Sequence, residues 1–156
     1  MIQIVAFEGL SPFLIGTPSY VKRGLLDKIP KILQSRVDVW RGSFMRSGPK
    51  PHVFANKIIV IGHSMGGPSA IWWCKQYPAL TVDLMITLDP RPLHQPYTKP
   101  KNVLHAVNFY RGDHGMLDMQ GYTVIGAKNN HCPDSSHPSL PFRKDVLELL
   151  LSTIGG

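Results

Sequence analysis

The chain is poor in charged residues, in cysteine and in long apolar runs. Only 17% of its 156 residues are charged and 43% are hydrophobic, which excludes a disordered chain and allows one domain with a sizeable core. Two cysteines, Cys74 and Cys132, are too few for a disulfide-rich framework. No apolar run approaches the length of a membrane span, and residues 2–7 already read as a core strand rather than as a leader segment. We therefore expect a single soluble, cytoplasmic domain over residues 1–156.

Acidic residues are also scarce, with 10 Asp and Glu against 17 Lys and Arg, so the net charge is +7. Such a balance suits an acidic partner. The basic residues are scattered through loops and helix faces, however, and no aromatic residues are interleaved with them as in nucleic-acid binding motifs. We interpret them as a solvated positive surface, expect no nucleic-acid partner, and allow only a weak attraction to anionic surfaces.

The most informative stretch is an apolar run at residues 57–61 that ends in the turn Gly62-His63-Ser64-Met65-Gly66. Residues 68–73 then read as the start of a buried helix. A strand that reverses into a helix over so few residues brings the backbone close to itself and leaves no room for Cβ atoms at the glycines. The turn should therefore push the Ser64 hydroxyl out of the sheet, with the Met65 amide facing the same space. A phosphate-binding turn is disfavoured, because neither a P-loop lysine nor a G-x-G-x-x-G spacing is present.

This turn resembles the nucleophile elbow of the α/β-hydrolase superfamily, especially that of lipases and esterases. The resemblance implies that Ser64 is the nucleophile and that the Met65 amide is one oxyanion-hole donor. In that family the loop after the first strand supplies the second donor, usually after a His-Gly pair. Here Glu8-Gly9 occupies the matching place, so the resemblance assigns the second donor to the Leu10 amide.

Apolar runs that alternate with helical patterns predict the remaining elements. Strands are expected at residues 1–7, 37–40, 82–88, 103–110 and 122–126, and helices at 17–28, 68–77 and 138–154. Residues 128–137 are expected to form a polar loop, and residues 91–101 are too short and too rich in proline for a mobile helical lid. The fold class is therefore α/β, with three layers, an α/β-hydrolase-like arrangement and a mainly parallel sheet of about six strands.

A serine nucleophile needs a base within hydrogen-bond reach and a third group that orients the base. His137 lies in a loop just before the last helix, where the family places its catalytic histidine; His131 and His114 are weaker candidates. Two residues compete as the acid. Asp89 follows the strand 82–88 directly, in a segment similar to that of pancreatic-type lipases, and Asp113 follows the next strand within a glycine-flanked loop. We favour Asp89, because a strand end holds a carboxylate more rigidly.

These residues predict a serine hydrolase that cleaves carboxylic esters of small molecules or lipids through an acyl-enzyme. A thioesterase, an acyltransferase or a peptidase with the same triad remains an alternative, as does a non-catalytic binding protein on a degraded hydrolase scaffold. No metal and no other cofactor is expected. The sequence does not decide the natural substrate or the oligomeric state.

Overall fold

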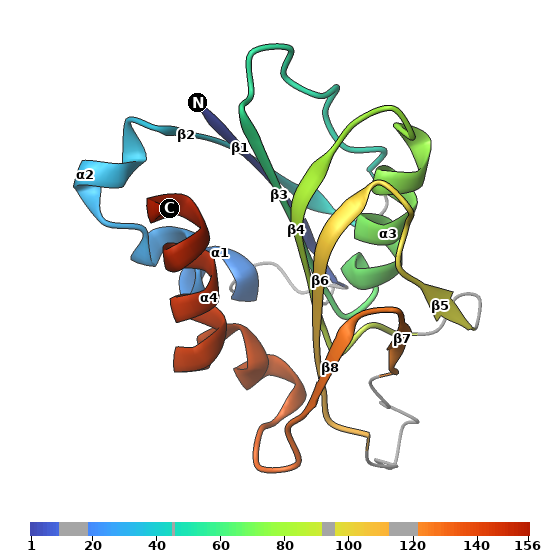
Figure 1. The fold of residues 1–156 in the computed structure, drawn as a ribbon. Helices are drawn as coiled ribbons and strands as arrows, with labels where there is room; N and C mark the ends of the chain where they lie inside the picture. The colour runs from blue at the N-terminus through green and yellow to red at the C-terminus, as the bar shows by residue number, and fades with distance from the viewer. Residues whose placement is uncertain (10–18, 45, 92–95, 113–121) are drawn as a thin grey trace.

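A six-stranded sheet, in which every neighbouring pair of strands is parallel, forms the centre of the fold (Figure 1). Its strands, in spatial order, are β2 (Val37–Ser43), β1 (Ile2–Glu8), β3 (Lys57–His63), β4 (Val82–Leu88), β6 (Val103–Tyr110) and β8 (Lys128–His131). A separate parallel pair joins β5 (Tyr97–Thr98) to β7 (Val124–Ile125). This computed structural model describes residues 1–9, 19–44, 46–91, 96–112 and 122–156.

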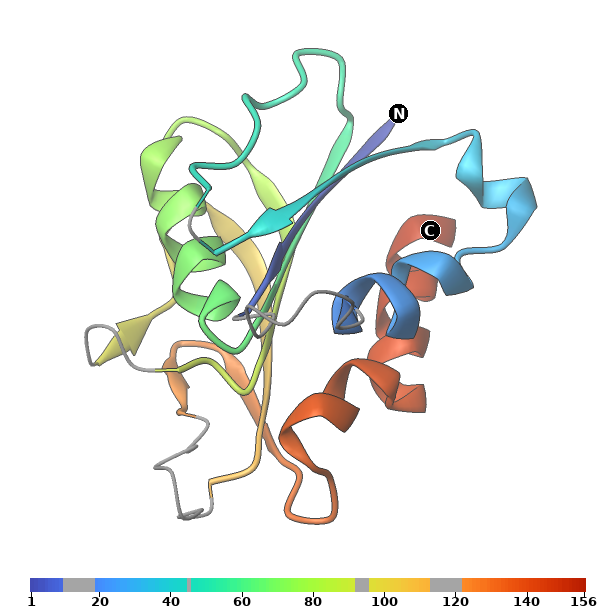
Figure 2. The same ribbon diagram turned by 180° about the vertical axis from the view of Figure 1, so that it is seen from behind.

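Helices cover both faces of the sheet, so the fold has three layers (Figures 1 and 2). The helical segments are α1 (Tyr20–Gly24), η1 (Leu26–Lys28), α2 (Lys31–Gln34), α3 (Gly66–Gln76), η2 (His137–Phe142) and α4 (Lys144–Gly155). One face packs against α1, η2 and α4, and α3 packs against the other. Along β1, Ile4 and Ala6 belong to the first core, whereas Val5 and Phe7 belong to the second. Burial on both faces explains the nearly continuous apolar sequence of this strand.

The expected fold class is confirmed, because the sheet has six parallel strands between helical layers. Within the described ranges, no helix combines the length and the apolar character that crossing a bilayer requires. Parallel strands present their carboxyl ends at one edge of a sheet, and open α/β sheets bind ligands there. Glu8, His63 and Leu88 are the last residues of β1, β3 and β4, so the segments that follow them meet at this edge.

Of the expectations for the last strands, one holds only in part and one is wrong. The segment expected as a strand at 122–126 contributes only β7 to the small sheet, and the sixth strand of the main sheet is β8, which was expected to be a loop. β8 is polar because it is an edge strand that pairs only with β6. Asn129, within β8, also accepts a hydrogen bond from the Val124 amide at 2.9 Å and donates to the Val124 carbonyl at 3.0 Å. Side-chain hydrogen bonds therefore hold a strand that has no apolar pattern.

The helix expected at 17–28 is shorter than predicted, because α1 begins at Tyr20 and ends at Gly24; residues 17 and 18 lie outside the described residues. Its start is capped by a residue from elsewhere in the chain. The Glu8 carboxylate accepts hydrogen bonds from the Val21 amide at 3.1 Å and from the Lys22 amide at 3.0 Å. A carboxylate at these otherwise unpaired donors satisfies the first turn of the helix and complements its dipole.

Candidate active site

The turn between β3 and α3 has the geometry of an elbow around Ser64. Ser64 has a φ of 57°, a left-handed conformation that is uncommon for a non-glycine residue and is typical of functional turns. Its amide donates to the Leu88 carbonyl at 2.9 Å, and its carbonyl accepts from the amides of Gly67 at 3.0 Å and Arg91 at 3.1 Å. Three hydrogen bonds therefore hold the backbone in this conformation.

Close backbone packing explains why glycines flank Ser64. A Cβ atom at Gly62 would overlap the Gly66 carbonyl oxygen, and a Cβ atom at Gly66 would overlap the carbonyl oxygen of Phe7 on β1. Only glycine fits where a strand turns back so tightly on its own helix and on a neighbouring strand. The predicted strand, tight turn and helix around Ser64 are thus present.

Asp89 lies at the end of β4, and it is fully buried with 0% of its surface exposed. It also has a positive φ, of 48°. Its Oδ1 accepts a hydrogen bond from the Arg111 amide at 3.0 Å, and its Oδ2 lies 2.6 Å from Nδ1 of His137. Because a carboxylate accepts, Nδ1 of His137 carries the hydrogen, and Nε2 of the neutral ring is left as an acceptor.

His137 is the first residue of η2, and hydrogen bonds within its loop hold it there. The Ser139 hydroxyl accepts from the Ser136 amide at 2.8 Å and donates to the Ser136 carbonyl at 2.9 Å. Arg143, just before α4, donates to Asp134 at 3.1 Å and to Ser135 at 2.7 Å. The loop that carries His137 is therefore fastened to α4.

The structure thus joins two of the predicted site residues directly, Asp89 and His137. Both residues are described together with Ser64, and no hydrogen bond within 3.5 Å joins the Ser64 hydroxyl to His137. Ser64 is connected to His137 through its neighbour His63, whose ring stacks on that of His137 with 4.7 Å between the centroids. Catalytic hydrogen bonds are often long in unliganded enzymes and tighten when substrate binds.

His63 is a site residue whose contacts the sequence did not indicate. It is 2% exposed, and its Nε2 donates to the His137 carbonyl oxygen at 3.0 Å. Burial, followed by the nearby His137, lowers the pKa of His63 to about 3, so its ring is neutral at physiological pH. The two histidines are 74 positions apart, and no local pattern connects them.

His131, a weaker candidate for the base, does not enter this arrangement. It lies on β8 with its ring tilted against that of Tyr110, and its Nε2 donates to the Arg111 carbonyl at 2.6 Å. Asp113 and His114 lie outside the described residues. So do residues 92–95, which belong to the segment 91–101 in which no helical lid was expected. The choice between Asp89 and Asp113 therefore stays a prediction.

The structure describes only one of the two predicted oxyanion donors, Met65. Met65 immediately precedes α3, so its amide is among the N-terminal groups without an intrahelical partner. Leu10 lies outside the described residues, but Gly9 before it is described. A Cβ atom at Gly9 would lie 2.6 Å from Cβ of Ser64 and 3.1 Å from its Oγ. The chain leaving β1 therefore passes directly against Ser64.

Glu8, which occupies the place of the family's histidine, has a structural role. It is 6% exposed and anchors α1 through the two amide contacts described above. Burial raises its pKa, although these amides and the Arg41 side chain at 3.9 Å act in the opposite direction. The carboxylate therefore positions α1 beside the elbow.

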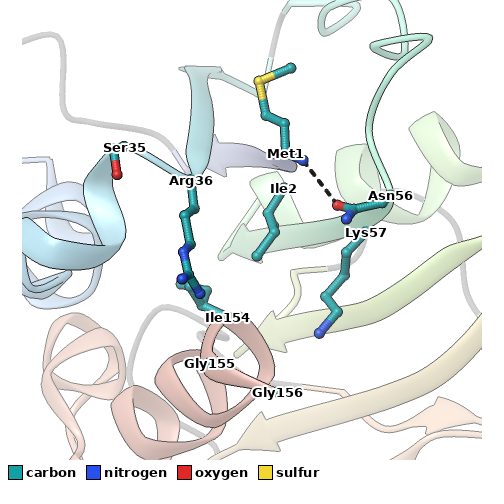
Figure 3. Close-up of a pocket in the computed structure, with 9 residues that line it drawn as sticks. All are labelled: Met1, Ile2, Ser35, Arg36, Asn56, Lys57, Ile154, Gly155 and Gly156. Carbon is teal, nitrogen blue, oxygen red and sulfur yellow. Dashed lines mark hydrogen bonds between the residues drawn. The ribbon is translucent and has the colours of Figure 1, made fainter.

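A hollow of about 520 Å³ lies at the other edge of the sheet, near the amino ends of β1 and β3 (Figure 3). Arg36 and Lys57 extend into it toward the end of α4, and the Met1 amino group donates to Asn56 at 3.2 Å. Its lining residues contain no nucleophile paired with a base. Among the residues that the structure describes, no three His, Cys, Asp or Glu side chains converge as a metal site.

The fold and these contacts define an α/β protein in which a buried aspartate is paired with a histidine beside a serine in a strand-to-helix elbow. Comparison with models of known protein families gives no match, and comparison with curated proteins gives none either.

Proposed function

We propose that this protein is a serine hydrolase that cleaves carboxylic esters, with Ser64 as nucleophile, His137 as base and Asp89 as the acid that orients the base. The observation that carries the proposal is the 2.6 Å contact between Asp89 Oδ2 and His137 Nδ1 next to the glycine-flanked elbow of Ser64. A buried carboxylate that fixes the histidine tautomer leaves Nε2 free to accept a proton.

In the proposed reaction, Nε2 of His137 takes the Ser64 proton as Oγ attacks the ester carbonyl carbon. The carbonyl oxygen becomes an oxyanion, which the amides of Met65 and Leu10 stabilise; each such donor is worth roughly 3 kcal/mol. The intermediate collapses as the bond to the alcohol oxygen breaks, and His137 returns the proton to that oxygen. Water then attacks the acyl-enzyme with the same base, which releases the acid and restores Ser64.

Two features bear on the alternatives. A thioesterase or acyltransferase would use the same residues. A thioesterase differs from the proposed esterase in its leaving group, and an acyltransferase differs in the acceptor that replaces water. A non-catalytic binding protein is favoured by Glu8, which serves as a helix anchor where the family usually has histidine. The pairing of buried Asp89 with His137 argues against that reading, because a degraded site has no need for a desolvated carboxylate at a histidine.

Hydrolysis of p-nitrophenyl acetate, butyrate and octanoate by purified variants tests the proposal. Ser64→Ala and His137→Ala should lose nearly all activity, and Asp89→Asn should lower kcat about 10⁴-fold, because it disturbs the tautomer of the base. Asp38→Asn, at an exposed position on β2, is the matched control and should keep wild-type activity. Asp113→Asn should be far less damaging than Asp89→Asn, and the reverse order would move the acid to Asp113.

Labelling with a fluorophosphonate separates the enzyme from the binding protein. The proposal requires that wild type is labelled at Ser64 and that Ser64→Ala is not. A folded wild type that neither turns over these esters nor reacts with the probe would refute the hydrolase and leave the binding protein as the better account. Labelling combined with poor ester turnover would instead direct the search toward thioesters and acyl transfer.

A further inference from the structure

We propose that His63 is a positioning residue for His137: its ring and its Nε2–H group, mounted on the end of β3, hold the base in place for Ser64. This inference rests on the proposed hydrolase function and extends it to a residue that takes no part in proton transfer. Its basis is a pair of contacts, the 3.0 Å hydrogen bond from His63 to the His137 carbonyl oxygen and the stacking of the two rings at 4.7 Å.

The hydrogen bond assigns the tautomer of His63. A carbonyl oxygen can only accept, so Nε2 of His63 must carry the hydrogen, and Nδ1 of the neutral ring is bare. No described residue forms a hydrogen bond with this buried Nδ1. A second proton there would have no acceptor among these residues and would place a positive charge against the base. His63 therefore acts as a neutral donor, and its only donor group is already used by His137.

The mounting of His63 is rigid. Its backbone belongs to β3, in register with Leu88 of β4, and its side chain is 2% exposed. His137 by contrast lies in the loop at the start of η2, and hydrogen bonds fix loops less firmly than paired strands do. The end of β3, which Ser64 directly follows, thus also holds the backbone of His137. The distance between the Ser64 hydroxyl and the His137 ring therefore depends on the position of this one strand.

Together with Asp89, His63 restrains His137 from three sides. Asp89 fixes Nδ1 at 2.6 Å, the stacked ring of His63 limits the tilt of the imidazole, and the Nε2–H group of His63 holds the backbone carbonyl. Loss of the donor should therefore let the loop shift while Asp89 stays in place. A misplaced catalytic group lowers the rate of the chemical step more than it lowers substrate affinity.

Two substitutions separate the donor from the ring. His63→Gln keeps an N–H donor at a similar reach, whereas His63→Phe keeps a flat ring of similar size and leaves the His137 carbonyl without its donor. We expect His63→Phe to lower kcat by about 10- to 100-fold with KM within about twofold, as for other residues that orient a functional histidine. His63→Gln should recover kcat to within about fivefold of wild type. His105→Phe, at an exposed position on β6, is the matched control and should leave kcat unchanged.

Rates are expressed per fluorophosphonate-reactive serine, so that a fraction of misfolded protein does not enter kcat. The acidic limb of the kcat/KM profile is a second readout: it reports the protonation of the base and should move in His63→Phe but not in His63→Gln. A role in packing alone would lower the denaturation midpoint and leave both kcat per active serine and this limb at wild-type values. That result would overturn the inference.

A third readout is independent of turnover. In protein labelled with ¹⁵N-histidine, the His137 Nδ1–H group bound to Asp89 should give a slowly exchanging, strongly deshielded proton signal, and His63 should show the Nε2–H tautomer. In His63→Phe the His137 signal should broaden or vanish, whereas His63→Gln should keep it. If wild type shows these signals but hydrolyses no ester, the hydrolase proposal fails while the positioning contact stands. If the signal is unchanged in His63→Phe, the positioning role fails by itself.

Discussion

Acidification should destabilise this protein through His63. The ordinary pKa of a histidine is 6.5, and burial together with the neighbouring His137 lowers that of His63 to about 3 in the folded protein. Between these values the unfolded chain binds a proton at His63 and the folded protein does not, so the free energy of unfolding falls as the pH falls. The contribution of neutral His63 is complete above about pH 6.5 and is lost progressively toward pH 3.

The loss of stability on acidification can be calculated from the shift in the pKa of His63. Each pKa unit corresponds to about 1.4 kcal/mol, so a shift of about 3.5 units amounts to roughly 5 kcal/mol when the pH has fallen to about 3. At about pH 4.5 the loss from His63 is roughly 3 kcal/mol. That is a large part of the 5 to 15 kcal/mol, roughly, by which domains are usually stable. Burial of this one imidazole should therefore set much of the acid sensitivity of the fold.

Urea unfolding, followed by tryptophan fluorescence at about pH 7.5, 6.0 and 4.5, measures this loss. Trp73, which is fully buried, provides the signal. Because His63→Gln cannot take up the proton, the stability difference between wild type and this variant should fall by roughly 3 kcal/mol between the highest and the lowest pH. Carboxylates titrate in both proteins and cancel in the difference. His105→Gln, at an exposed position, is the control. Its free energy of unfolding should fall on acidification as much as that of wild type, because His63 is still present.

A difference in the free energy of unfolding between wild type and His63→Gln that is the same at all three pH values, within about 0.5 kcal/mol, would refute the effect. His63 would then be able to accept a proton in the folded state, and neither its burial nor its neutral tautomer would hold in solution. A difference that grows on acidification would contradict the sign of the shift, because the folded state would then favour the charged ring.

Three further outcomes follow from single side chains. Gly9→Ala should lower kcat/KM by about 100-fold or more, because the added Cβ would lie 2.6 Å from Cβ of Ser64. The control Gly155→Ala, whose Cβ would meet nothing within 4 Å, should retain full activity. Equal activity of the two variants would contradict the prediction. Glu8→Gln should lower the free energy of unfolding by about 1 to 3 kcal/mol, because one of the two amides of α1 loses its acceptor; an unchanged urea midpoint would count against the anchor. Burial raises the pKa of Cys74 to about 12, so this thiol should resist maleimide labelling near pH 8 until urea unfolds the chain, and peptide mapping that finds rapid labelling of the native protein would disprove this.

The elbow was predictable because everything that defines it is local. The apolar run, the glycines and Ser64 all lie within residues 57–67, and the tight turn requires small residues at fixed offsets. Most strands were predictable for the same reason, since burial on both faces demands continuous apolar sequence. The partnership of His137 with Asp89 was predicted from the resemblance to a family, and the structure joins these two side chains at 2.6 Å.

Other elements were missed because their sequence carries no such pattern. β8 is a polar edge strand, and its Asn129 is held by bonds to the β7 segment and to Asn108, which donates to it at 2.8 Å. The start of α1 at Tyr20 could not be predicted from local sequence either, because the group that caps it is a glutamate on β1. Both β8 and the start of α1 depend on partners that are distant along the chain, and the local pattern of apolar residues does not indicate such partners.

The fold class and the elbow could be predicted from the amino-acid sequence, because apolar periodicity and glycine placement act over a few neighbouring residues. The stacking of His63 on His137, the anchoring of α1 by Glu8 and the contact of Gly9 with Ser64 became visible only in the folded chain. These contacts arise because a parallel sheet gathers the carboxyl ends of strands that are far apart in sequence at one edge. Residues brought together in this way leave no mark in their own local sequence.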